Sequence, residues 1–122
     1  MTEREQQAID SLAKDEWVIF KGKIRAECEH MASVTPLDLR YTETSQSLIV
    51  ERFENNAALK VLRLHFDVAV PRIVWQCMNP FEKSGWFTFR IAGTTVLYLA
   101  NNANTPPAEL IRQLTMCLTG QL

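Results

Sequence analysis

The spacing of apolar residues along this chain changes twice, and these changes constrain the fold more than any other feature. From Thr2 to about Ser33 the apolar residues recur at steps of three and four, as on one side of an α-helix: Ile9, Ala13, Trp17, Phe20, Ile24, Cys28 and Met31. From Leu37 to Ala100 the period is two, as strands with one buried face require. After Thr105 the helical spacing returns. The sequence therefore predicts a helix, a run of strands and a second helix.

The first helix has one weak point and one competing interpretation. Gly22 lies off the apolar stripe and costs a helix interior about 1 kcal/mol relative to alanine, so we consider a bend, or a break into two shorter helices, at this position. Residues 17–20 have high β-propensity and could form a short strand instead. The helix is favoured because the stripe continues in phase on both sides. Pro36 ends it, since proline biases the preceding residue away from helical geometry.

Six strands are expected in the middle of the chain, over residues 37–42, 48–53, 59–66, 72–78, 86–91 and 95–100. Pro80 is expected to break the ladder, residues 82–85 to form a loop, and Gly93 to form a tight turn. The reversal at residues 67–71 is less defined, because Val68 and Val70 could extend the strand. Such short links favour antiparallel neighbours, since a parallel crossover needs a dozen or more residues.

The second helix is predicted from a start signal and a stop signal. Thr105 could cap the first turn with its hydroxyl, and Pro106 suits the first helical position. Gly120 suits the left-handed conformation that commonly ends a helix. The stripe between them consists of Leu110, Ile111, Leu114, Cys117 and Leu118. Residues 1–122 are therefore expected to form a single α+β domain, with an antiparallel sheet flanked by N-terminal and C-terminal helices.

Composition restricts the classes of partner. The formal net charge is -1, so no global field draws the chain onto nucleic acid or anionic lipid, and neither partner is expected. The apolar segment 96–100 is far shorter than the roughly 20 residues that cross a bilayer. The charged amino terminus lacks the apolar run of a secretory signal, which predicts a cytoplasmic location. Three widely separated cysteines fit neither a disulfide framework nor a metal pair, so we expect reduced thiols.

Three of the four candidate site residues come from the expected hairpin at residues 59–78, and the fourth, Tyr98, comes from the expected strand at residues 95–100. A reversal near residues 68–69 would place Arg63 opposite Trp75, a cation–π pair at sheet spacing. It would also place His65 and Cys77 on one face, although too far apart for a catalytic dyad. No set of catalytic residues, metal ligands or cofactor-binding motifs stands out. As ligand-binding candidates we name Arg63, His65, Trp75 and Tyr98.

Three functions remain open. The first is a small non-enzymatic binding or interaction module that self-associates, because strand 72–78 carries apolar residues on both faces. The second is a pocket between a curved sheet and the C-terminal helix, either catalytic or holding a small apolar ligand. The third is an adaptor or chaperone-like domain that holds another protein on its sheet or its long first helix.

Overall fold

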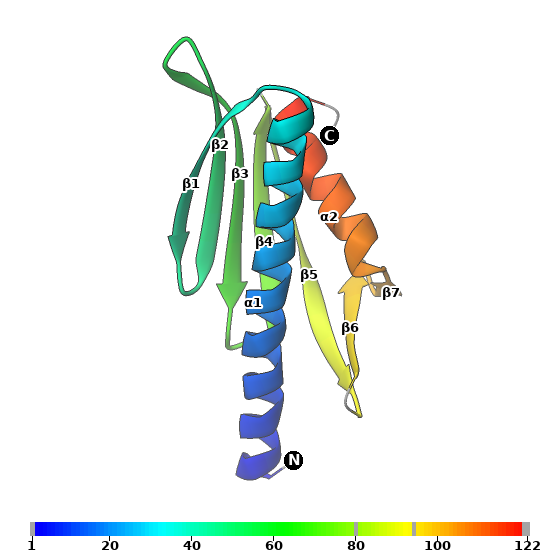
Figure 1. Ribbon diagram of the computed structural model, residues 1–122. Helices are drawn as coiled ribbons and strands as arrows, with labels where there is room; N and C mark the ends of the chain where they lie inside the picture. Colours follow the sequence, from blue (N-terminus) through cyan, green and yellow to red (C-terminus); the bar gives the residue numbers. More distant parts are fainter. Residues whose placement is uncertain (1, 80, 94, 121–122) are drawn as a thin grey trace.

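The computed structural model describes residues 2–79, 81–93 and 95–120 and has the predicted α+β architecture (Figure 1). Helix α1 (Glu3–Val34) precedes the sheet, and helix α2 (Pro107–Thr115) follows it and continues into the 3-10 helix η1 (Met116–Thr119). Within the described residues the sheet has seven strands rather than six: β1 (Asp38–Thr44), β2 (Ser47–Glu54), β3 (Ala57–Asp67), β4 (Arg72–Asn79), β5 (Phe81–Ala92), β6 (Thr95–Ala100) and β7 (Ala103–Asn104).

The sheet is an antiparallel meander in which every strand pairs with its neighbour in the sequence, as the short links predict. Two of the turns consist of asparagine pairs with positive φ, namely Asn55–Asn56 and Asn101–Asn102. Asparagine tolerates this left-handed conformation better than most residues, and a turn of this kind matches the twist of the strands it joins. The second pair leads into strand β7, which was not among the six strands expected from the sequence.

Helix α1 is continuous, so both the break at Gly22 and the competing strand at residues 17–20 are wrong. A methyl group added at Gly22 would meet nothing within 4 Å. The helix begins with a capping box between Thr2 and Glu5, and it ends where Thr35 becomes extended before the proline, as predicted. Thr105 does not cap α2, because its hydroxyl donates to the carbonyl of Ala103.

Both helices pack on the same face of the sheet (Figure 1). The α1 stripe contacts an aromatic cluster, with ring centroids 5.7 Å apart for Trp17 and Phe66 and 5.2 Å apart for Phe20 and Phe87. The apolar stripe of α2 and η1 is buried against the same side: Leu110, Leu114, Cys117 and Leu118. The opposite face of the sheet, which we call the open face, is covered by neither helix in the described part of the chain.

A disulfide joins Cys77 of β4 to Cys117 of η1, so the expectation of three reduced thiols is wrong. Their Cα atoms lie 5.8 Å apart although 40 residues separate them in the sequence. Cysteine spacing alone could not predict this pair, because only the packing of η1 against β3 and β4 brings the two residues together. Cys28 of α1 stays free and buried among the described residues.

The expected hairpin register is off by one residue. Arg63 pairs with Gln76, and Leu64 pairs with Trp75. A shift of one residue moves a side chain to the other face. The predicted contact between Arg63 and Trp75 is therefore wrong, and His65 and Cys77 lie on opposite faces. Residues 82–85 also differ from prediction, since they belong to β5; Pro80 lies outside the described residues.

Candidate functional site

The open face carries more apolar side chains than a solvated sheet face ordinarily does. Residues paired directly across antiparallel strands point to the same face, so the register identifies its members. The apolar ones are Ile49, Phe53, Val61, Val74, Met78, Trp86, Leu97 and Leu99. Trp86 is 61% exposed and lies beside Val74, its partner across β4 and β5. The guanidinium of Arg72 lies 5.8 Å from the Trp86 ring centroid.

Charges of both signs surround these apolar residues on the open face. The cations are Arg40, Arg63, Arg72 and Arg90, and the anions are Asp38, Glu51, Asp67 and Glu82. Two pairs are already formed within the chain, Arg40 with Asp38 at 3.1 Å and Arg72 with Asp67 at 3.5 Å. The balance of four against four differs from the single-signed surfaces typical of phosphate recognition.

Arg63 and His65 are brought together on this face, at a shallow depression of about 220 Å³. Its other lining residues are Ser47, Ile49, Leu64, Val74 and Gln76. This volume lies below the roughly 300–1,000 Å³ of sites that enclose a small molecule. The depression can hold a partner's side chain more readily than a whole ligand.

Trp75 and Tyr98 lie on the helix side of the sheet, away from Arg63 and His65. A methyl group at Gly85 would stand 2.8 Å from the Trp75 ring, so the indole packs directly on the backbone of β5. The Tyr98 hydroxyl is buried and donates to the carboxylate of Glu16 in α1. Burial and this hydrogen bond raise the pKa of Tyr98 well above its usual value. The four candidates therefore do not form one site, and as ligand contacts they stay predictions.

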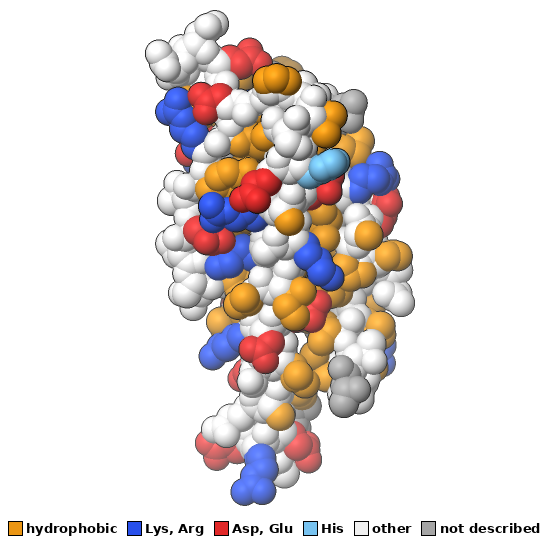
Figure 2. Space-filling model, in the orientation of Figure 1, with side chains coloured by type: hydrophobic (Ala, Val, Ile, Leu, Met, Phe, Trp, Pro, Cys, Tyr) orange, Lys and Arg blue, Asp and Glu red, His pale blue; other side chains and the backbone are white. Residues whose placement is uncertain are grey.

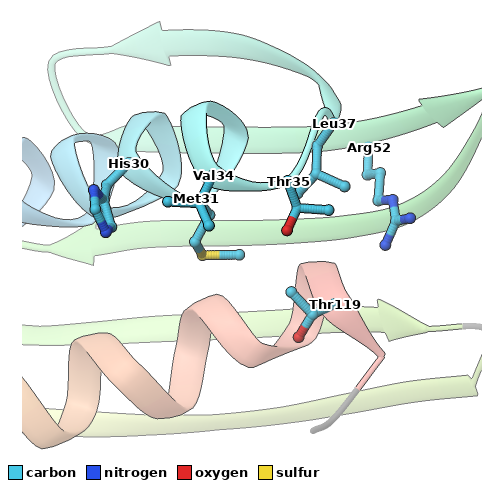
Figure 3. Close-up of a pocket in the computed structure, with 7 residues that line it drawn as sticks. All are labelled: His30, Met31, Val34, Thr35, Leu37, Arg52 and Thr119. Atoms are coloured by element: carbon cyan, nitrogen blue, oxygen red, sulfur yellow. The ribbon is translucent and has the colours of Figure 1, made fainter.

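A larger hollow, which we call the end cleft, opens between the end of α1 and η1 (Figure 3). Its volume is about 460 Å³, and its lining residues are His30, Met31, Val34, Thr35, Leu37, Arg52 and Thr119. Sequence reasoning missed it, although β2 held a signal. Leu48 and Val50 are buried on the helix side, and Arg52 takes the next position on that side, where a charged residue breaks the apolar pattern.

Arg52 is held in place by two hydrogen bonds. Its Nη1 donates to the carbonyl of Leu118 at 2.9 Å, and its Nη2 donates to the carboxylate of Glu54 at 3.0 Å. The first bond satisfies a carbonyl at the end of η1, a favourable position for a cation. A guanidinium has five N–H donors, so within the described residues these two bonds leave donors free for a further acceptor.

Burial, with smaller contributions from Glu27 and Glu29, raises the pKa of the Cys28 thiol to about 12. The thiol is therefore protonated near neutral pH and is a poor nucleophile.

No group of three or more His, Cys, Asp or Glu side chains suited to a metal occurs among the described residues. In the same part of the chain, neither helix has the length and apolar character needed to cross a membrane. Searches of protein-family models, curated proteins and solved structures found no match to this chain.

Proposed function

We propose that this protein is a non-enzymatic binding module that self-associates through the open face of its sheet. The observation that carries the proposal is the placement of both helices on one side, which leaves the apolar residues around Trp86 uncovered. A tryptophan in such a position is the residue type that most often dominates the energy of a protein interface. A second copy of the chain would remove it from water.

The charges of the open face favour a second copy as the partner. In a two-fold symmetric interface the same surface meets itself, so a self-complementary face must offer both signs of charge. Arg63 and Arg90 have no ion-pair partner within the described residues, and neither has Glu51. These side chains are available to pair across an interface, where they would set its register.

The area of the open face lies at the lower end of the range of standard interfaces. Five gaps of about 4.8 Å between β1 and β6, and strands of about eight residues rising 3.3 Å each, give a flat area of roughly 600 Å² before side-chain relief is counted. A standard interface buries about 800 Å² on each partner. Most of the open face would therefore have to take part.

Two substitutions on β5 test which face associates. Trp86→Lys places a cation beside Arg72 on the open face and should shift sedimentation velocity toward single chains. Phe81→Lys is the matched control, because Phe81 is an 81% exposed aromatic on the same strand whose position alternates to the helix side. Equal association of both variants and the wild type would remove the open face from the proposal.

A second candidate, an adaptor that holds another protein, is favoured by apolar side chains that α1 exposes beside its buried stripe. These are Leu12, Val18 and Ile19, and Figure 2 shows apolar patches along this helix. The adaptor predicts that the isolated protein sediments as single chains. It also predicts that a second protein copurifies from the native cell and is lost with Ile19→Lys.

The cytoplasmic location expected from the amino terminus stays a prediction and does not follow from self-association. Disulfides persist mainly in oxidising compartments, so the bond between Cys77 and Cys117 counts against this location. Alkylating the thiols inside intact native cells, before lysis, provides the test. Modified Cys77 and Cys117 would support the cytoplasm, and a pair that reacts only after reduction would contradict it.

A further inference from the structure

We infer that the end cleft is a binding site for an amphipathic monocarboxylate, a molecule with one carboxylate head and an unbranched apolar chain. This site is separate from the open face and is independent of self-association. The cleft volume of about 460 Å³ falls within the range typical of small-molecule sites. Figure 3 shows α1 and the following linker forming one wall, with η1 opposite.

The apolar part of the cleft is formed by Met31, Val34 and Leu37. Val34 is 70% exposed, which is unusual for valine beside a packed core, and Met31 is only partly buried. Covering these side chains with an alkyl chain would remove apolar surface from water on both partners. Methionine also adapts its shape to irregular ligands more easily than branched residues do.

Arg52 supplies the polar end of the site. Its side chain is 21% exposed and is fixed by the Leu118 carbonyl, so the guanidinium is positioned before a ligand arrives. Its remaining donors suit a carboxylate, which guanidinium binds in a two-point arrangement. Glu54 already offsets part of the charge of Arg52, which favours a single negative charge over a phosphate dianion. None of the cleft's lining residues in the described part of the chain is acidic.

The test uses sodium decanoate as the probe, below the concentration at which it forms micelles, and isothermal titration calorimetry as the measurement. Wild-type protein should bind decanoate saturably, one molecule per chain. Decan-1-ol, which has the same chain without the charge, should bind at least tenfold more weakly. Absence of saturable binding, or equal affinity for the alcohol, would overturn the inference.

Two matched variants of α1 locate the site. Val34→Asp places a negative charge at the cleft and should weaken decanoate binding at least tenfold. Val18→Asp is the control, because Val18 is 59% exposed on the same helix and lies outside the cleft. Both replaced side chains are exposed, so both variants should fold. An affinity unchanged by Val34→Asp, or weakened equally by Val18→Asp, would place any bound decanoate elsewhere and refute the inference.

Discussion

Reducing the disulfide between Cys77 and Cys117 should cost the protein a large share of its stability. The bond closes a loop across a sequence separation of 40 residues. In the chain-entropy model, a cross-link over this separation removes about 13 cal/mol/K from the unfolded chain, or about 4 kcal/mol at 25 °C. A typical domain has only about 5–15 kcal/mol of unfolding free energy, so the reduced protein should be marginal.

The assay is urea unfolding with and without a phosphine reductant, followed by circular dichroism. Reduction should lower the midpoint and raise the denaturant dependence, because the reduced unfolded chain exposes more surface. A Cys28→Ala variant keeps the disulfide and should lose the same amount on reduction. A Cys77→Ala, Cys117→Ala double variant should not respond to the reductant. A midpoint unchanged by reduction in the wild type, or three free thiols before reduction, would refute the reasoning.

Two further predictions concern a pair of glycines, Gly85 and Gly22, and the buried Tyr98. Gly85→Ala forces a methyl group against the Trp75 ring and should lower the unfolding free energy by about 1–3 kcal/mol, whereas Gly22→Ala, in open space within a helix, should raise it by about 1 kcal/mol. Equal effects in urea unfolding would contradict this. Tyr98→Phe should cost about 1–2 kcal/mol near neutral pH through loss of the bond to Glu16. Because folding raises the pKa of Tyr98, its contribution is complete below about pH 10 and declines above it as the unfolded chain ionises first. The variant should therefore lose less stability between neutral pH and alkaline pH than the wild type.

Much of the fold could be predicted because its signals are local. The stripe of α1 runs over many turns in phase, and the buried residues Trp17, Phe20, Ile24 and Cys28 all belong to it. The strands of the meander likewise alternate over short, clearly separated segments. Gly22 misled the reasoning about α1 because helix propensity is a weak effect, which packing of the long stripe overrides.

The register of β3 and β4 could not be predicted, because the signals around residues 67–71 conflict. Val68 and Val70 favour strand, whereas the structure ends β3 at Asp67 and begins β4 at Arg72. A turn placed one residue earlier or later changes the face of every following side chain. For the same reason, the part of β5 at residues 82–85 resembled a loop, since its pairing with β4 comes from tertiary structure and not from β-propensity.

The candidate sites were less predictable than the fold, because each is assembled from distant segments. The end cleft is formed by residues of α1, β2 and η1. Its one signal in the sequence is Arg52, which interrupts the apolar positions on the helix side of β2. Apolar residues on both faces of β4 were visible in the sequence, as Ile73 and Trp75 on one side and Val74 and Met78 on the other. Whether those faces were covered depended on where the helices packed, which periodicity does not determine.

The measurement that tests the central proposal most directly is the sedimentation-equilibrium mass of the wild-type protein at micromolar concentration. If a second copy buries the open face, the measured mass should be twice that of the 14.0 kDa chain. It should fall toward the mass of one chain as the protein is diluted. A mass of one chain throughout the micromolar range would show that the open face faces water and would contradict self-association.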